Sequence, residues 1–417
     1  MKQQAILLLF LSWFAAIASE PPAATFELGS ITEAAQAATR LDDCIAPRFR
    51  DTVAGVTVAL SLGAAQYGMD LSRPMEISFY SFGEKPAMRI HCHALPNVRD
   101  PRDSGRLWGI RFTARRRNGR VVFDSAGVKD PFPDIPPGSH LKSGDLIRGR
   151  LSAAHIRQHF QFRAFNTKDP APRLILGGLD DLLRELDRAD LVFSAGREVL
   201  KAELTLYPAA GSALAEWMKR PLPPKGKIET FGGAKTLTVL RLNPTETLRR
   251  YAAAYLGPGF PAELAAAANG FAVRTSTTVR PHLMHTMRIS AGLLPGKEAM
   301  IRPSFEKLKE TPWHWRQFSR DPVGLCLLEK DRLAVFGADR MDTGRIQAMF
   351  EPEEFQGTLP DRPLVCIDLE NPEKPLAELR FENGTMRLIL QAPDSWFAEC
   401  RPLLEKPLLF QAERRRP

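Results

Sequence analysis

Internal repetition constrains the fold of this 417-residue chain more than any other feature. Residues 237–251 (LTVLRLNPTETLRRY) align without a gap with residues 146–160 (LIRGRLSAAHIRQHF). Both segments begin with an alternating strand pattern that ends in leucine. Both then continue into a helical pattern behind a capping residue, Asn243 or Ser152. A match of this kind is typical of a fold assembled from one repeated supersecondary unit.

Two more segments extend the series of repeats. Residues 26–38 are a looser third copy with Thr32 as the cap, and residues 364–375 are a fourth copy whose helix is lost to a second proline. Each opening is followed by a predicted hairpin, and the second strands of these hairpins cover residues 88–96, 201–209, 287–295 and 386–394. In the last hairpin, Asn383-Gly384 is a strong two-residue turn signal.

The four repeats form two halves, which we place at residues 24–222 and 234–410. The first repeat of each half adds a second hairpin, at residues 109–127 and 324–339. Because strands outnumber helices and come as hairpins, the sequence predicts an α+β fold of internally duplicated strand-helix-hairpin units. We expect mainly antiparallel sheets with helices packed on one face.

The first 18 residues have the pattern of a secretory signal peptide. Lys2 precedes an apolar or small-residue run over residues 5–18, and Ala16 and Ala18 supply the small residues of a cleavage site. The run is shorter than the roughly 20 residues that a membrane-spanning helix needs, and no later run approaches that length. We therefore expect a protein without a membrane span that begins near Ser19 and is exported, to the periplasm or the medium.

The charge balance favours anionic partners. The whole chain carries a net charge of +9, and loss of the signal peptide removes Lys2 and no acid, which leaves +8. Such a charge suits an anionic envelope component, for example phospholipid headgroups, an acidic polysaccharide or a phosphate-bearing polymer. Ordinary solubility charge is the alternative, and the partner would then be another protein. Export argues against a nucleic-acid partner.

A histidine pair, His91 and His93, flanks Cys92 in the segment MRIHCHALP. In a strand the two imidazoles share one face and could share a zinc ion, but zinc needs a third and usually a fourth ligand. The sequence offers only distant histidines for this role: His155, His159, His282 and His285. The matching strands of the other repeats lack such residues, so we interpret the pair as part of an ordinary strand and expect no metal and no cofactor.

Two clusters are candidates for binding. Trp313 and Trp315 could stack against sugar rings, and the alternative is that they fill the core. Four arginines surround the predicted turn Asn118-Gly119 and could grip phosphate or carboxylate groups, or simply form a solvated loop; they are Arg115, Arg116, Arg117 and Arg120.

Motifs for catalysis are missing from the sequence, which contains no GxSxG elbow, Walker loop or GxGxxG. The five cysteines include no CxxC pair, and their number is odd, so at least one thiol is free or pairs between chains. The sequence thus favours an exported, non-catalytic binding or scaffold protein over an enzyme. The alternative is an exported hydrolase, metal-assisted through His91 and His93, that acts on an envelope or extracellular polymer held by Trp313 and Trp315.

Overall fold

The protein forms two compact units. Unit 1 comprises Met1–Gln161, Leu186–Ala209 and Ala392–Pro417, and unit 2 comprises Phe162–Glu185 and Ala210–Gln391. The computed structural model describes residues 22–45, 57–58, 61–81, 87–98, 102–107, 110–128, 130–159, 181–243, 262–280, 284–320, 323–338, 348 and 350–405. The predicted signal peptide, residues 1–18, lies outside these ranges, and the predicted halves 24–222 and 234–410 stay a prediction.

Unit 1 is built on an antiparallel sheet. Its strands are β1 (Ala24–Leu28), β2 (Met75–Phe79), β3 (Met88–His93), β4 (Ser104–Leu107), β5 (Ile110–Arg117), β6 (Arg120–Ser125), β7 (Asp145–Ser152), β8 (Leu186–Ala195) and β9 (Val199–Pro208). They pair in the order β4-β5-β6-β3-β2-β1-β7-β8-β9. The turn between β5 and β6 is Asn118-Gly119, and both residues have positive φ, 50° and 67°, as a tight hairpin turn requires.

Three helices accompany this sheet: α2 (Ile31–Ile45), α4 (Ala153–His159) and α11 (Asp394–Glu405). The N-terminus of α2 is a capping box, since the Glu33 amide donates to Ser30 Oγ and the Ser30 amide donates to the Glu33 carboxylate, both at 3.1 Å. Ser30, and not the expected Thr32, is therefore the cap. Helix α11 packs against α2, and Arg40 forms an ion pair with Asp394 at 3.2 Å.

Unit 2 is also built on antiparallel strands. Its strands are β11 (Thr236–Leu240), β12 (Ala268–Thr277), β13 (Thr286–Leu293), β14 (Glu306–Lys307), β15 (His314–Arg320), β16 (Val323–Glu329), β17 (Arg332–Ala338), β19 (Leu364–Asp368), β20 (Asn371–Glu382) and β21 (Thr385–Pro393), whose last two residues fall in unit 1. A small separate pair joins β10 (Glu229–Thr230) to β18 (Glu353–Glu354). The predicted Asn383-Gly384 turn connects β20 to β21.

The strand order of unit 2 is β14-β15-β16-β17-β13-β12-β11-β19-β20-β21. From β15 onward, this order has the same pattern of connections as the sheet of unit 1 from β4 onward. The helices of unit 2 are short: α6 (Ala213–Met218), α8 (Ala262–Ala267), α9 (Lys297–Ile301) and the 3₁₀ turn η2 (Arg302–Ser304).

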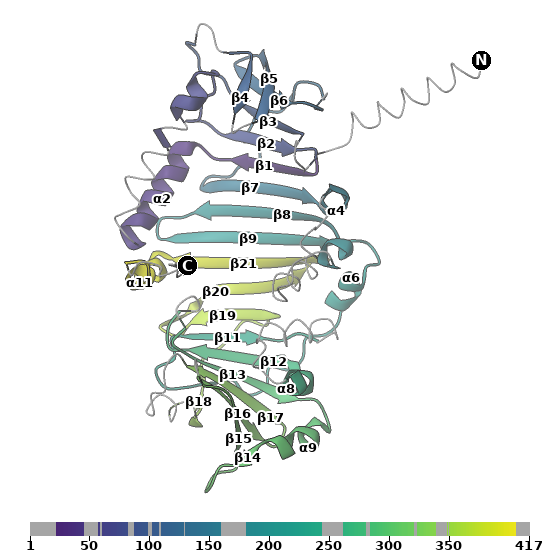
Figure 1. The fold of residues 1–417 in the computed structure, drawn as a ribbon, viewed down its shortest axis with the longest axis vertical. Coiled ribbons are helices and arrows are strands. Elements are labelled where there is room, and N and C mark those ends of the chain that lie inside the picture. Colours follow the sequence, from purple (N-terminus) through teal and green to yellow (C-terminus); the bar gives the residue numbers. More distant parts are fainter. Residues whose placement is uncertain are drawn as a thin grey trace, which may run out of the picture. The chain divides into compact units, whose positions relative to one another are not determined.

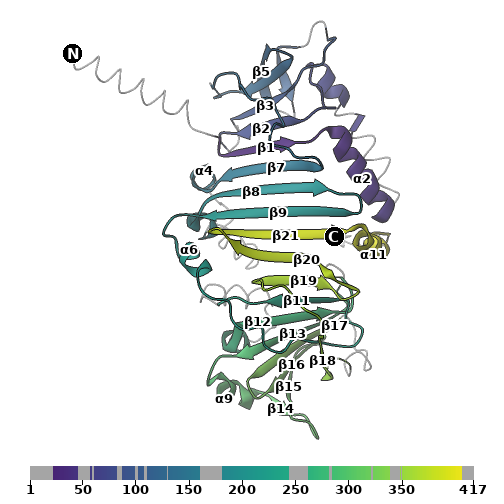
Figure 2. The ribbon, with the colours of Figure 1, turned by 180° about the vertical axis from the view of Figure 1, so that it is seen from behind.

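The predicted α+β fold with helices packed on one face of the sheets was wrong. The protein is mostly antiparallel sheet, with 47% strand and 18% helix. Helices of five to seven residues such as α4, α6, α8 and α9 are too short to cover a sheet, and they lie toward the ends of the strands (Figures 1 and 2). Of the predicted helical openings, the one in residues 26–38 is the 15-residue α2 and the one behind Ser152 is described over the seven residues of α4. The helix expected after Asn243 lies outside the described residues.

The core of unit 1 explains why β3 is buried along its whole length. Ile90 and Cys92 point into an apolar cluster with Phe112, Val121 and Phe123, so the residues between them must face the other side of the sheet. That side is polar, yet it is buried as well. Another segment of the chain must therefore cover the polar face of β3.

Three of the five cysteines have side chains that the structure describes, and these three are buried. Cys92, Cys326 and Cys366 are free thiols, and burial raises the pKa of Cys92 and Cys326 to about 12. They behave as small apolar core residues.

None of the helices that the structure describes combines the length and apolar character of a membrane span.

Candidate functional site

The histidine pair lies on the covered polar side of β3. His91 is fully buried (0% exposed), and neither of its ring nitrogens has a hydrogen-bond partner among the described residues. Its ring meets Phe132 edge-on, with the centroids 5.9 Å apart. Burial, followed by the charges of Arg120 and Arg89, lowers the pKa of His91 to about 4. His91 is thus a neutral, buried group, as an ordinary strand residue would be.

The cover over this face is the proline-rich connector, residues 130–140. Arg89 donates to the carbonyl oxygens of Asp130 and Pro131 at 2.9 and 3.1 Å, and it pairs with Asp124 at 2.7 Å. At the other end, the backbone amide of His140 donates to Glu27 at 3.2 Å. This segment therefore encloses the polar face of the sheet.

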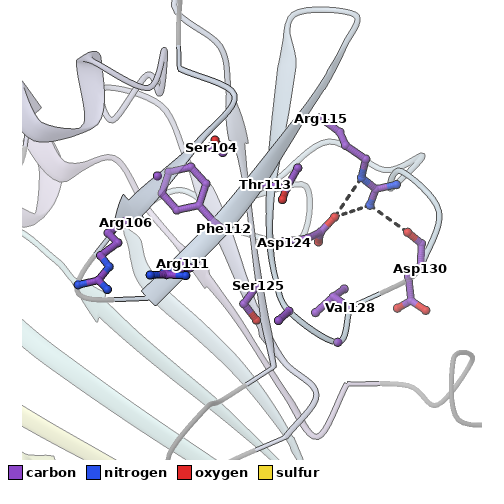
Figure 3. Close-up of a pocket in the computed structure, with 13 residues that line it drawn as sticks. Ser104, Arg106, Arg111, Phe112, Thr113, Arg115, Asp124, Ser125, Val128 and Asp130 are labelled. Atoms are coloured by element: carbon purple, nitrogen blue, oxygen red, sulfur yellow. Dashed lines mark hydrogen bonds and ion pairs between the residues drawn. The ribbon is translucent and has the colours of Figure 1, made fainter.

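The hairpin arginines largely serve the same structural purpose. Arg115 binds Asp124 at 3.0 Å and the carbonyl of Asp130 at 2.9 Å (Figure 3). Arg120 donates to the carbonyls of Pro133 and Asp134, both at 3.1 Å. These two guanidinium groups therefore hold the connector in place.

Arg116 and Arg117 complete the set of predicted hairpin arginines. Arg116 pairs with Asp103 and donates to the carbonyls of Tyr67 and Arg102, at 3.2 and 3.0 Å. Arg117 is exposed next to the turn. The predicted cluster is thus not one binding surface. Three of its arginines bind neighbouring carboxylate or carbonyl oxygens, and among the described residues no such contact is found for the exposed Arg117.

A wide, open hollow of about 860 Å³ lies beside these residues, and Figure 3 shows its walls. Arg106 and Arg111 line one side, and Arg115, Asp124 and Asp130 line the other. The carboxylate of Asp124 already neutralises Arg115, and it also pairs with the buried Arg89. The hollow is wide and open, so water and salt screen its charges, which makes it a weak candidate for an anion.

A smaller cavity in unit 2, of about 310 Å³, has a different character. Its floor follows from the register of β12, β13 and β17. Ser290 lies opposite Arg274 on one side and opposite Ala334 on the other, and Gly292 lies opposite Arg332. Small residues at these positions leave space, because no atom beyond the chain neighbours lies within 4 Å of the place where a Cβ of Gly292 would stand.

Arginines surround this floor from three strands. Arg288, two residues before Ser290, faces the same side of the sheet, and its side chain is only 2% exposed. Arg288 and Arg332 share one carboxylate, that of the buried Glu229. Arg274 donates to the carbonyl of Lys225. The backbone can approach Arg274 here because the next residue, Gly226, has no side chain and a φ of +61°.

The arginines of the cavity are poorly solvated. Burial lowers the pKa of Arg274 and of Arg288, while Glu229 opposes that effect for both. Nε and Nη1 of Arg288 are buried, and they have no hydrogen-bond partner in the described part of the chain. Two guanidinium donors thus lie at the cavity without an acceptor.

The tryptophans of the predicted aromatic cluster lie next to this cavity. Trp313 lines it, and both Trp313 and Trp315 pack against the apolar cluster that contains Phe231 and Phe336. Trp313 is half-buried against this cluster and also lines the cavity, and its stacking against a sugar ring stays a prediction.

A metal centre at the histidine pair receives no support from the geometry. Among the described residues, no group of three or more His, Cys, Asp and Glu side chains is placed to hold a metal ion. Of the distant candidates, His155 lies on α4 and His285 is exposed before β13. His282 and the side chain of His159 lie outside the described residues.

Sequence reasoning missed the three arginines because they meet only through strand register. One signal was available: Arg89, Arg288 and Arg387 all follow a methionine at the start of repeated strands. A single charge at a fixed position of otherwise apolar strands indicates a buried ionic partner.

Comparisons with known proteins add no functional information. No protein-family model matches the chain, and no curated protein matches it. Among solved structures, three crystal forms (I, III and IV) of a protein called TP0453 match 50% of this chain and 87–88% of their own, at 9–10% sequence identity and a TM-score of 0.23. A likeness this weak supports no conclusion about fold or function.

Proposed function

We propose that the protein is an exported, non-catalytic binding protein that holds an acidic sugar in the cavity of unit 2. The observation that carries the proposal is Arg288, which lines this cavity and whose buried Nε and Nη1 have no hydrogen-bond partner among the described residues. An unsatisfied buried donor costs about 1–3 kcal/mol, and more when the group is charged. An anion that accepts from Arg288 removes that cost.

The charges around the cavity favour an anionic group in particular. Lys227, Arg274, Arg288 and Arg332 line the cavity, against one acid, Asp331. Three acids lie outside the lining: Glu229 is shared between Arg288 and Arg332, Glu354 pairs with Lys227 at 3.3 Å, and Glu329 lies 3.9 Å from Arg332. The case for an anion therefore rests on the buried guanidinium groups and not on a large excess of positive charge. Guanidinium groups bind carboxylate and phosphate oxygens through paired, charge-assisted hydrogen bonds. The ligand is therefore a carboxylate or a phosphate ester.

The aromatic wall and the volume favour a sugar ring as the carrier of that anion. An indole offers a broad apolar face to a ring, and Trp313 is the aromatic residue at the cavity. A volume of about 310 Å³ is at the lower end of the range for small-molecule sites, roughly 300–1,000 Å³. One monosaccharide unit, free or at the end of a polymer, suits this space.

The lining favours binding over catalysis. Of the described residues that line the cavity, Asp331 is the one acid, and histidine and cysteine are absent. Hydrolysis of a glycosidic bond commonly uses two carboxyl groups that flank the bond. A single carboxylate among cations is better suited to orienting hydroxyl groups of a bound sugar.

The binding part of the proposal is tested by isothermal titration calorimetry with glucuronate, glucose 6-phosphate and glucose. We expect the two anions to bind and glucose to bind at least tenfold more weakly, with affinity falling as salt is added. Arg332→Ala should weaken anion binding about ten- to hundredfold, as loss of a charged hydrogen-bond donor does. Arg302→Ala is the matched control, because Arg302 is 42% exposed against 43% for Arg332, pairs with Glu298 and lies outside the lining of the cavity. Equal binding of glucose and glucuronate would refute the proposal.

The export part rests on the first 18 residues and is tested separately. N-terminal sequencing of the protein recovered from the envelope or medium of a bacterial host should find a start near Ser19. Recovery of a chain that still begins at Met1, in the cytoplasm alone, would overturn this part.

A further inference from the structure

Unit 1 contains an apolar cavity that the proposed function leaves unused. It has a volume of about 580 Å³ and lies between α2, residues 63–75 and the strands β1, β7, β8 and β9. Every described residue of its wall is apolar or glycine except Gln66, Tyr67, Arg73 and Arg106. Protein interiors are close-packed, and voids larger than a water molecule are few. A void of this size therefore calls for an occupant.

The cavity exists because one wall is made of small side chains. Helix α2 contributes Ala34, Ala37 and Ala38, which share one helical face. The opposite wall is large and apolar and includes Ile147 of β7 and Phe193 of β8. Leucine side chains at these three positions would fill the cavity, whereas alanine side chains leave space between α2 and the sheet.

The polar residues of the wall add positive charge at the solvent side. Arg73 and Arg106 are both exposed, and no acid lines the cavity. Within the part of the chain that the structure describes, neither guanidinium is recorded in an ion pair. The Tyr67 hydroxyl donates to the backbone carbonyl of Arg106 at 3.0 Å, which fixes the backbone at this end of the cavity.

We propose that unit 1 binds a single-chain, long-chain carboxylate, with its hydrocarbon tail in the apolar cavity and its carboxylate at Arg73 and Arg106. The apolar wall suits the tail, because burial of each methylene is favourable. The two unpaired cations suit the head, because an arginine–carboxylate pair at a site partly shielded from water is favourable. The volume lies in the middle of the range for small-molecule sites.

The experiment is displacement of the fluorescent fatty acid cis-parinaric acid from the full-length protein by saturated carboxylates of increasing length. We expect one binding site per chain and an affinity that rises about fourfold for each added methylene until the cavity is full. Hexadecanol should compete more weakly than hexadecanoate. Affinity that does not depend on chain length, or equal competition by the alcohol, would overturn the proposal.

Two variants locate the site. Ala38→Phe fills the cavity and should reduce parinarate binding at least tenfold, while Gln36→Phe, which adds the same ring on the exposed side of α2, should leave binding unchanged.

If Ala38→Phe fails to fold, as judged by circular dichroism, the double substitution Arg73→Gln/Arg106→Gln tests the site at its solvent-exposed end. That variant should remove the preference for the carboxylate over the alcohol, and Arg111→Gln should keep it. Wild-type binding in a folded Ala38→Phe protein, or an unchanged preference in the double variant, would place the ligand elsewhere.

A phospholipid or an apolar peptide is the other kind of occupant that the wall admits. Competition by dipalmitoyl phosphatidylglycerol vesicles or by an apolar peptide at concentrations where hexadecanoate fails would contradict the assignment to a single-chain carboxylate.

Discussion

Gly292 lies directly opposite Arg332 across the β13–β17 pair, and the space where its Cβ would stand is empty. Because Gly292 has no side chain, the guanidinium group of Arg332 borders the cavity of unit 2 and does not pack against a side chain at position 292. The backbone φ of Gly292 is not in the left-handed region, so a side chain fits here without strain. The glycine is needed for the cavity and not for the strand.

Gly292→Leu is predicted to remove anion binding while the fold stays intact. The leucine enters the cavity without displacing backbone, so the free energy of unfolding should change by less than about 1 kcal/mol, and a gain in strand propensity favours an increase. Calorimetry with glucuronate and urea denaturation measure the two effects. Gly292→Ala, which fills less of the space, should give an intermediate affinity; full binding in both variants would show that the ligand lies outside the cavity.

Arg89→Ala is predicted to destabilise the protein by about 3–5 kcal/mol. Arg89 and Asp124 form a buried ion pair, with side chains only 5% and 10% exposed. Removal of Arg89 leaves this buried carboxylate with Arg115 as its other recorded partner and also removes two hydrogen bonds to the connector carbonyls. Arg150→Ala is the control, because Arg150 is 70% exposed in its pair with Asp190 and should contribute at most about 1 kcal/mol. Urea unfolding compares the two, and equal losses would contradict the buried role of Arg89.

The hairpin arginines are predicted to differ sharply from one another. Arg120→Ser removes two hydrogen bonds to the connector and a contact of its guanidinium with the ring of Phe132 at 5.5 Å, so about 1–3 kcal/mol of stability should be lost. Arg117→Ser, at an exposed position of the same hairpin, should change stability by no more than about 0.5 kcal/mol. Faster proteolysis within residues 130–140 in the Arg120 variant alone would support this account, whereas identical behaviour of both variants would not.

His91 is predicted to make the protein less stable in acid. Its pKa is about 4 in the folded state and about 6.5 when unfolded, so the unfolded chain binds more protons between these values. Stability should therefore fall as the pH drops from about 6.5 to about 4, by roughly 2–3 kcal/mol from this residue alone. Below pH 4 its contribution no longer changes.

His91→Leu isolates this effect, because His93 and Glu76 also titrate abnormally. Burial lowers the pKa of His93, and burial raises that of Glu76, which acts in the opposite direction. The leucine variant should show a weaker loss of stability between pH 6.5 and 4, measured by urea denaturation at several pH values. A pH profile parallel to that of the wild type would mean that the pKa of His91 is the same in the folded and the unfolded protein.

Strand pairing could be predicted from the sequence further than helix length could. The Asn118-Gly119 and Asn383-Gly384 turns join strands as their sequences indicate, because a two-residue hairpin turn depends on local backbone conformation. The length of a helix depends instead on tertiary packing, which cannot be read from a short stretch of sequence. The pattern behind Ser152, for example, yields only the seven residues of α4.

The candidate site was visible in the sequence only at Trp313. Arg274, Arg288 and Arg332 lie on three different strands, and they meet because Ser290 pairs with Arg274 while Gly292 pairs with Arg332. Register across strands is a tertiary property. In the same way, the hairpin arginines form an obvious charged cluster in the sequence, but backbone carbonyl groups of residues 130–134 occupy two of them.

The central claim, an acidic sugar bound in unit 2, is tested most directly by a crystal structure of the protein with glucuronate. The account predicts the sugar ring against Trp313 and its carboxylate within hydrogen-bond distance of Arg288 Nε or Nη1, over the floor made by Ser290 and Gly292. Glucuronate bound at the exposed Arg117 or in the hollow beside Arg111, with the unit 2 cavity holding only solvent, would contradict it.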